Sequence, residues 1–316
     1  MLRLCVLVLP VLLMLPSQAQ SLAERLGYPP TAKLLIVNGD DTGMCHTANQ
    51  ATIRSLEEGL MTSATIMVPC PWFPEIATYA KANPQRDFGL HLVQTSEWNT
   101  YRWGPVASRN EVPGLIDPDG YFWHEVPQVY AKGTPQEALI ESRAQIRKAL
   151  AAGIDVTHLD SHMGTLQYHP AYLEMYRQLA VEFDLPVRMA SQATFDAAGQ
   201  SQWRARFAAD GTLFTDDFVH DMKYDGAASV KEFWKKRLKE LKPGVTEIYI
   251  HAGLPTDELK SITGSWAVRS AEFEAFTTDP EIRELLEREK VQRIGYRVIR
   301  DLQRSLRAKQ PQTTKP

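Results

Sequence analysis

Two adjacent carboxylates, Asp40 and Asp41, directly follow the apolar run 34–37 and the pair Asn38-Gly39. A short apolar run predicts a buried strand, and the loops after parallel strands assemble the active sites of α/β proteins. Because two neighbouring carboxylates repel each other, we expect a cation beside them. A divalent metal would hold one carboxylate as a ligand and leave the other to move a proton, as metal-assisted hydrolysis requires.

Histidines stand at the ends of further strand-like runs, at His91, His162 and His251. Imidazole nitrogens and carboxylate oxygens together are typical ligands of first-row metals, zinc above all. Their recurrence at several strand ends therefore predicts a metal site. The spacing of His158 and His162 leaves open which imidazole is the ligand, because a strand and a helical turn would both bring these two side chains to one side.

Two other uses of paired carboxylates fit less well. Asp41-Thr42-Gly43 matches the motif of aspartic proteases, but those enzymes need a second copy of it and an all-β context. This chain has one copy, followed by a helical pattern. A glycoside hydrolase needs two carboxylates on opposite sides of the scissile bond, which the adjacent Asp40 and Asp41 do not supply. Another carboxylate would have to join them, and none is strongly indicated.

The segment 94–133 shows little helical or strand periodicity and is rich in aromatic residues. Long ordered loops of compact domains are usually lids or binding loops, and aromatic faces stack on sugar rings. We therefore expect the segment to be an insertion loop that binds substrate, although its rings would also serve simply to pack it onto the domain. The expected substrate-binding side chains are Trp98, Tyr101, Trp103 and Trp123, together with His158.

Strand-like and helical runs alternate along the chain, which indicates an α/β fold with a parallel sheet or barrel. Seven strand-like runs suit a distorted or seven-stranded β/α barrel, and no linker divides residues 20–308, so we expect a single domain. Strands are expected at 34–37, 64–68, 88–92, 156–159, 187–189, 247–250 and 291–294. Helices are expected at 47–58, 74–82, 135–152, 171–183, 230–241, 280–289 and 296–308.

The 316 residues carry a net charge of -3, which argues against a nucleic-acid partner and favours a neutral small molecule or glycan. Residues 1–19 have the basic start, apolar core and small-x-small ending of a secretory signal peptide. We therefore expect a secreted or periplasmic protein without a membrane span after cleavage. Export would permit Cys45 and Cys70 to form a disulfide. The alternative is that both remain buried thiols. The polar tail 309–316 is expected to be disordered, and the oligomeric state is open.

Several pieces of the sequence together resemble the YdjC-like carbohydrate deacetylases, which include chitooligosaccharide deacetylases. They occur in the family's order and span most of the chain. The matching pieces are Leu-Ile-Val-Asn-Gly-Asp-Asp-Thr-Gly (35–43), Gly-Leu-Met-Thr-Ser-Ala-Thr (59–65), Gly-Leu-His-Leu (89–92), Thr-His-Leu-Asp-Ser-His (157–162) and His-Ala-Gly (251–253).

The resemblance implies a TIM-barrel-like hydrolase that removes N-acetyl groups from amino sugars or acetylated oligosaccharides. It implies Asp41, His91 and His162 as metal ligands, Asp40 as general base and His251 as general acid. The metal would be Zn²⁺, with Mg²⁺, Co²⁺, Ni²⁺ or Mn²⁺ as alternatives. A metallohydrolase of the same fold acting on another amide or an O-acetyl ester is the nearest alternative function. A non-catalytic glycan-binding barrel is an alternative of another class.

The chain departs from the family pattern at three places that bear on the substrate pocket. Thr42 stands where an aromatic residue is usual, Met163-Gly164-Thr165 stands where further histidines are usual, and Ala252 replaces the usual proline.

Overall fold

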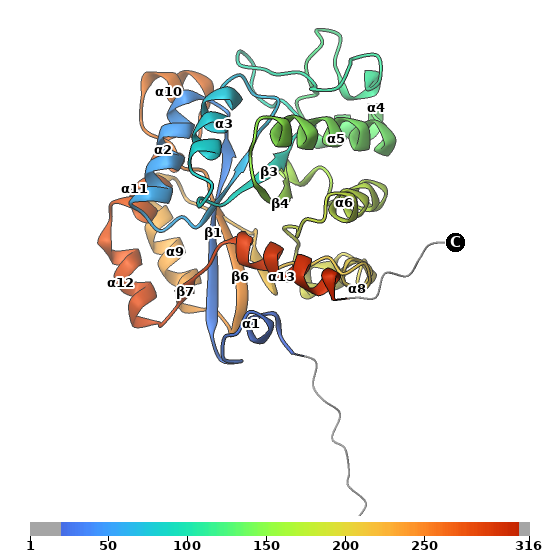
Figure 1. Cartoon of the computed structure of the whole chain (residues 1–316). Coiled ribbons are helices and arrows are strands. Elements are labelled where there is room, and N and C mark those ends of the chain that lie inside the picture. Colours follow the sequence, from blue (N-terminus) through green and yellow to red (C-terminus); the bar gives the residue numbers. More distant parts are fainter. Residues whose placement is uncertain (1–19, 310–316) are drawn as a thin grey trace, which may run out of the picture.

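The computed structural model describes residues 20–309, so the expected signal peptide at 1–19 and nearly all of the expected tail lie outside the described residues. All strand pairs are parallel, and the strands follow the order β4-β3-β2-β1-β6-β5, with β7 beside the first half of β1 (Figure 1). Their bounds are β1 Lys33–Thr42, β2 Ser63–Ile66, β3 Phe88–Leu92, β4 Val156–Ser161, β5 Asp217–Val219, β6 Gly244–Ile250 and β7 Gln292–Arg293.

The two edges of this sheet approach each other through a segment that is not a regular strand. Val187 forms an isolated parallel bridge with Leu159 of β4, and its amide donates to the carbonyl of Leu213, a short distance before β5. The curled parallel sheet confirms the predicted distorted barrel of a single α/β domain. The strand predicted at 187–189 is wrong in detail, because that segment makes only one bridge, and β5 was not predicted.

Helices surround the sheet, with α2, α9, α11 and α12 on one side in Figure 1 and α5, α6, α8 and α13 on the other. The seven predicted helices correspond to α2 His46–Glu57, α3 Phe73–Ala82, α5 Pro135–Ala151, α6 Pro170–Glu182, α9 Val230–Lys239, α12 Pro280–Arg288 and α13 Tyr296–Ala308. Those not predicted are α1 Leu22–Arg25, α4 Val126–Lys132, α7 Gln192–Ala197, α8 Gln202–Ala209, α10 Asp257–Ile262 and α11 Trp266–Thr277. Short 3₁₀ turns lie at Pro113–Leu115, His162–Gly164 and Ala227–Ser229.

Local sequence explains how the predicted helices begin and end, as α5 shows. The Thr134 side chain accepts from the amide of Glu137, while the Glu137 carboxylate accepts from the amide of Thr134. This capping box satisfies two backbone donors at the start of the helix. Gly153, with φ of 88°, follows the helix and adopts the left-handed conformation that glycine tolerates best.

The carboxyl ends of the strands share one end of the barrel. In Figure 1, α1 lies where β1 begins, whereas the insertion after β3 and helix α10 after β6 lie at the opposite end. Cys45 follows β1 and Cys70 follows β2. Both are buried, and both are free thiols. The disulfide that export would permit is therefore not formed in this structure.

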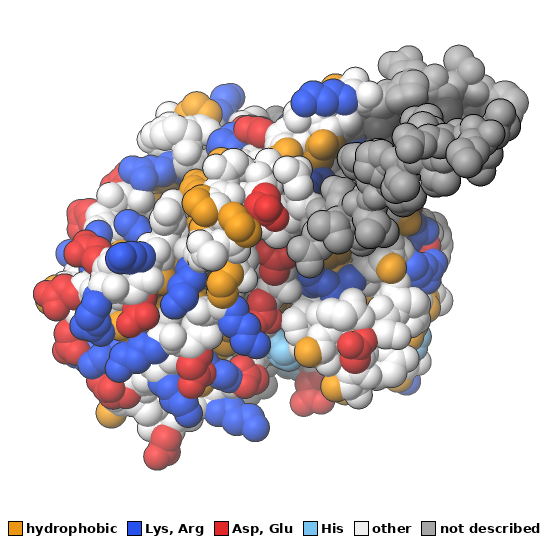
Figure 2. Space-filling view, turned by 90° about the horizontal axis from the view of Figure 1, so that it is seen from below, with side chains coloured by type: hydrophobic (Ala, Val, Ile, Leu, Met, Phe, Trp, Pro, Cys, Tyr) orange, Lys and Arg blue, Asp and Glu red, His pale blue; other side chains and the backbone are white. Residues whose placement is uncertain are grey.

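Within residues 20–309, no helix combines the length and apolarity needed to cross a bilayer. Figure 2 shows one face of the molecule, on which acidic and basic side chains are intermixed. This mixture agrees with the small net charge.

The barrel interior is packed tightly enough to give a stability prediction. A Cβ added at Gly89 of β3 would lie 2.4 Å from the ring of His158, which is itself stacked on Tyr296 at a centroid distance of 3.8 Å. Because the His158 ring has no room to retreat, Gly89→Ala is expected to destabilise the fold by about 1–3 kcal/mol. The measurement is the change in Tm. Gly264→Ala is the control, because nothing lies within 4 Å of that Cβ, and equal Tm values for the two variants would contradict the packing argument.

Candidate active site

A bulge at the end of β1 brings Asp40 and Asp41 to the same cavity. Side chains of consecutive strand residues normally point to opposite faces. Here the pairing of β1 with β2 shifts register between Gly39 and Thr42, and Asp41 has φ of 61°, the left-handed region. Such a bulge redirects a side chain. Both carboxylates consequently line one cavity of about 330 Å³ at the carboxyl end of the sheet.

Asp41 forms a compact group with two histidines. The Oδ1 atom of Asp41 lies 3.4 Å from Nε2 of His91 and 3.4 Å from Nδ1 of His162. All three side chains are buried, and Asp41 Oδ1 has no hydrogen-bond partner among the described residues. A buried carboxylate oxygen without a donor is costly, so three converging ligand atoms around it fit a metal ion. Asp41, His91 and His162 thus form a group that could bind a divalent metal.

Further side chains hold these three groups in place. Nδ1 of His91 lies 2.5 Å from Oδ2 of Asp160, and Nε2 of His162 lies 3.0 Å from Oε2 of Glu97. Each imidazole thereby turns one nitrogen to a carboxylate and the other toward Asp41. Metal-binding histidines commonly have this second carboxylate partner, which orients the ring and makes it a stronger ligand.

Asp41 and Asp40 each pair with a different arginine. Arg269 donates to Oδ2 of Asp41 at 2.7 Å, which leaves Oδ1 facing the histidines. Arg188 contacts both oxygens of Asp40, at 2.7 and 2.8 Å. Burial alone would raise the pKa values of both carboxyls, but Arg188 holds the pKa of Asp40 well below its usual range and Arg269 does the same for Asp41. Both aspartates are therefore ionised at neutral pH.

Arg188 also connects the cavity to the barrel interior. Its Nη1 donates to Asp160 at 2.6 Å, and its Nε donates to Glu247 of β6 at 2.8 Å. Burial raises the pKa of Glu247 to about 7, against the effect of Arg188. Tyr296 donates to the second oxygen of Glu247. The guanidinium of Arg188 is therefore held in one orientation by several anions, and it positions Asp40.

The charge balance of the cavity favours a bound cation. Among residues 20–309, the carboxylates that line the cavity, Asp40, Asp41, Asp160 and Glu97, are accompanied there by two guanidiniums, those of Arg188 and Arg269. Burial opposes protonation of the histidines, but Asp160 and then Asp40 raise the pKa of His91 to about 10, and Glu97 raises that of His162 to about 9. The carboxylates that attract these two protons would equally attract one divalent ion in their place.

His251 lies at the rim of the same cavity, and its side chain is 27% exposed. Its Nε2 is 3.9 Å from Oδ2 of Asp41, and its Nδ1 is 3.8 Å from Oε2 of Glu272 on α11. The backbone amide of His251 donates to the same Glu272 oxygen at 2.8 Å. One nitrogen of the imidazole therefore faces the cavity and the other faces a buried carboxylate, which is a suitable geometry for proton transfer.

The prediction that His158 contacts substrate is wrong. His158 and Asp160 share one face of β4, but two residues along a strand cover about 6.6 Å, so His158 lies deeper in the barrel. It is fully buried between Gly89 and Tyr296, and burial moves its pKa well below the usual range, so the ring is neutral. His162 lies beyond the end of β4, in a 3₁₀ turn, and lines the cavity.

For the insertion loop, the structure shows the packing role that the sequence left as the alternative to sugar binding. Among the described residues, none of its four predicted sugar-binding rings lines the cavity. Trp103 is buried and donates to the carbonyl of Thr95, Tyr101 donates to the carbonyl of Met44, and Trp123 donates to that of Gly114. The ring of Trp98 packs edge-on against that of Trp103, with centroids 5.4 Å apart. These side chains fold the loop onto the domain.

The loop reaches the cavity through Glu97, which the sequence analysis did not single out. Arg188, Asp160, Arg269 and Glu272 were likewise missed as site residues. Arg188 carried a signal, because it is the one charged residue in the run Val187-Arg188-Met189, and Asp160 lay within a recognised motif. Arg269 and Glu272 carried little, because the buried charges themselves hide the amphipathic pattern of α11.

The chain is similar to known proteins in sequence and in fold. The family model described as YdjC-like protein matches residues 34–288. The carbohydrate deacetylase of Thermoanaerobacter pseudethanolicus is 27% identical over 85% of this chain and 100% of its own length, and that of Brevibacillus brevis is 30% identical over 83% and 98%. A crystal structure of a proposed cellobiose-phosphate cleavage protein from Enterococcus faecalis V583 has 25% identity and a TM-score of 0.73, covering 85% of this chain and 99% of its own. The chain therefore belongs to the YdjC-like protein family.

Proposed function

We propose that this protein is a metal-dependent deacetylase that hydrolyses the N-acetyl group of an amino sugar or acetylated oligosaccharide. The observation that carries the proposal is the convergence of Asp41, His91 and His162 on one point beside Asp40, with His251 on the rim of the same cavity. The carbohydrate deacetylases among its relatives support the same reaction class.

The roles follow from position and charge. Asp41 Oδ1, His91 Nε2 and His162 Nδ1 would hold the metal, which when bound acidifies water and polarises the acyl carbonyl. Asp40, kept ionised by Arg188, accepts the proton of the attacking water. His251 donates a proton to the departing nitrogen, since its Nε2 faces the cavity.

The donor set favours zinc. One carboxylate oxygen and two imidazole nitrogens form a three-ligand set that leaves room for water and substrate, as in catalytic zinc sites. Co²⁺, Ni²⁺, Mn²⁺ or Mg²⁺ are the alternatives, and metal analysis of the purified protein distinguishes them.

The test is acetate release from N-acetylated chitooligosaccharides by metal-loaded and chelated protein. We expect release only from the loaded form. Release only from O-acetyl esters or from non-sugar amides would move the protein to another metallohydrolase class. Binding of the oligosaccharides without release from any substrate would instead favour a glycan-binding barrel.

Glu97 is expected to strengthen metal binding through His162. Glu97→Gln keeps the shape of the side chain but removes the charge beside Nε2 of His162. Loss of such a carboxylate partner typically weakens metal binding by about 10–100-fold, and we expect a loss of that order for Glu97→Gln. Competition with a metal indicator measures the change. Glu111→Gln, at an exposed position of the same loop, is the control, and equal affinities of the two variants would refute the role.

Replacement of His251 tests the proposed proton donor. His251→Asn is expected to lower kcat for N-acetyl substrates by about 10²–10⁴-fold, because the amine then leaves without a positioned acid. Hydrolysis of 4-nitrophenyl acetate should fall much less, since nitrophenolate leaves without protonation. An equal loss on both substrates would contradict the acid role. His46→Asn, at a half-exposed histidine paired with Glu75, is the control.

We also propose export of the enzyme, on the sequence of residues 1–19 alone. N-terminal sequencing of the protein recovered from its host tests this, and an intact Met1 on the active protein would oppose it.

A further inference from the structure

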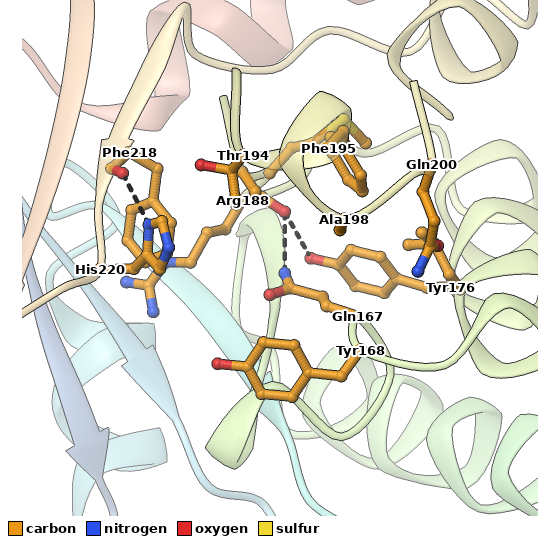
Figure 3. Close-up of a pocket in the computed structure, with 13 residues that line it drawn as sticks. Gln167, Tyr168, Tyr176, Arg188, Thr194, Phe195, Ala198, Gln200, Phe218 and His220 are labelled. Atoms are coloured by element: carbon orange, nitrogen blue, oxygen red, sulfur yellow. Dashed lines mark hydrogen bonds between the residues drawn. The ribbon is translucent and has the colours of Figure 1, made fainter. Parts of the chain in front are cut away.

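A second cavity of about 110 Å³ opens beside the catalytic one. Five side chains line both cavities: Gln167, Tyr168, Arg188, Phe218 and His220. The rest of the second cavity, which we call the side pocket, is mainly apolar. Its wall includes Leu173, Met189, Phe195 and Ala198. Figure 3 shows Phe195 and Ala198 on one side of this pocket and Tyr168 near its border.

The Arg188 carbonyl, the Tyr176 hydroxyl and the Arg188 guanidinium beside the side pocket are already bonded within the protein. Nε2 of Gln167 donates to the carbonyl of Arg188 at 3.0 Å (Figure 3). The hydroxyl of Tyr176 shares its one proton between the carbonyl of Leu159, at 2.6 Å, and that of Arg188, at 3.3 Å. The guanidinium of Arg188 is engaged by Asp40, Asp160 and Glu247. A sugar ring placed here would bury hydroxyls with few available partners, which is unfavourable, whereas an apolar group would lose nothing.

The volume restricts the size of that apolar group. An apolar cavity of about 150 Å³ holds a benzene molecule, so the side pocket suits about four carbon atoms. An acetyl methyl would leave most of the space empty, which forfeits contacts with the pocket wall.

The position of the side pocket relative to His251 determines which part of the substrate enters it. The rings of Phe218 and Tyr249 lie 5.5 Å apart, and those of Tyr249 and His251 lie 5.4 Å apart, so the aromatic wall runs from the side pocket to the proposed proton donor. In a planar amide, the nitrogen and the acyl chain are different substituents of the trigonal carbonyl carbon and diverge from it at an obtuse angle. With the nitrogen at His251, the acyl chain points toward Phe218 and the side pocket.

We propose that the side pocket binds the acyl chain of the substrate, so that the enzyme prefers N-acyl amino sugars with short chains longer than acetyl. This inference rests on the proposed function. The reaction is the same hydrolysis: the oxygen of water bonds to the acyl carbon, the C–N bond breaks, and the amine leaves with a proton while the fatty acid leaves as a carboxylate.

The experiment compares kcat/KM for N-acetyl-, N-butyryl- and N-octanoylglucosamine by release of the free amine. Each buried methylene contributes about fourfold, so the two additional methylenes of the butyryl chain should raise kcat/KM over that of the N-acetyl substrate by on the order of tenfold. N-octanoyl should gain nothing further, because its chain exceeds the pocket. Ala198→Phe places a ring in the pocket and should abolish the preference. Ala197→Phe, at the neighbouring exposed alanine that does not line the pocket, should retain it.

The outcomes separate this inference from the proposed function. A butyryl-to-acetyl ratio of one or less, or a ratio that Ala198→Phe leaves unchanged, would overturn the acyl pocket while the deacetylase function stands. A series of alkyl glycosides of N-acetylglucosamine covers the other occupant: a gain from methyl to butyl glycoside that only Ala198→Phe removes would assign the pocket to the aglycone. If no amide is hydrolysed, calorimetry decides, since N-butyrylglucosamine should still bind about tenfold more tightly than N-acetylglucosamine to wild type and equally to Ala198→Phe.

Discussion

Asp40→Asn is expected to reduce kcat for deacetylation by about 10²–10⁴-fold while metal binding persists. The asparagine keeps the size of the side chain and its contact with Asn38, but it can no longer accept a proton from water. Asp40 is outside the group formed by Asp41, His91 and His162. It also lies near His91 and Asp160, but both of its oxygens accept from Arg188, so the metal content should remain near that of the wild type. Steady-state acetate release and metal analysis of the same preparation measure both quantities.

The control for this variant is Asp257→Asn, whose carboxylate is fully exposed on α10. It should keep wild-type turnover. Asp40→Asn leaves Arg188 with Asp160 and Glu247 as partners, so the fold should survive, and Tm should be checked before kinetics are interpreted. Wild-type turnover by a metal-loaded Asp40→Asn protein would exclude Asp40 as the base.

Asp41→Asn is expected to weaken metal binding by more than about 100-fold and to abolish turnover at limiting metal, since a lost ligand costs more than a lost ligand partner. Asparagine tolerates the left-handed backbone conformation that Asp41 adopts at φ of 61°, so the bulge should persist. The amide leaves Arg269 without its anion, and it offers the two imidazoles an uncharged carbonyl oxygen or an NH2 group in place of the carboxylate oxygen on which they converge. Titration of the chelated protein with Zn²⁺, followed by calorimetry, measures the affinity.

Chelation of the wild-type protein provides the matched comparison. It should remove acetate release, and added Zn²⁺ should restore the release in the wild type but not in Asp41→Asn at the same free metal concentration. Full restoration in both proteins would show that Asp41 does not hold the metal.

The sequence predicted the parallel barrel because its strands and helices are encoded locally. The apolar run before Asp40 is buried on both faces, and Thr134, Glu137 and Gly153 form the predicted boundaries of α5. The prediction failed where tertiary contacts replace local pattern. The segment at Val187 makes one bridge at the closing edge, and α11 buries the charged residues Arg269 and Glu272. Charged residues are rarely buried, so a charged residue in a sequence is normally assigned to the surface, and a buried one is missed.

The active-site residues, like the fold, were predicted from the sequence in part, and the rest only the structure revealed. By itself the sequence determined which residue types stand at the strand ends, because parallel strands deliver their carboxyl ends to one edge whatever the details of packing. It therefore sufficed to nominate Asp40, Asp41, His91, His162 and His251. It did not show how deep each side chain lies, so His158 and the aromatic rings of the insertion were misassigned.

Only the tertiary structure decided the partners. The left-handed conformation of Asp41 turns two neighbouring carboxylates into one cavity, and Glu97, Arg188 and Arg269 arrive there from segments far apart in the chain. Charge and burial at one point in space depend on these distant contacts. Local sequence determines which groups are present, whereas the electrostatic field that orients and ionises them is a sum over the folded molecule.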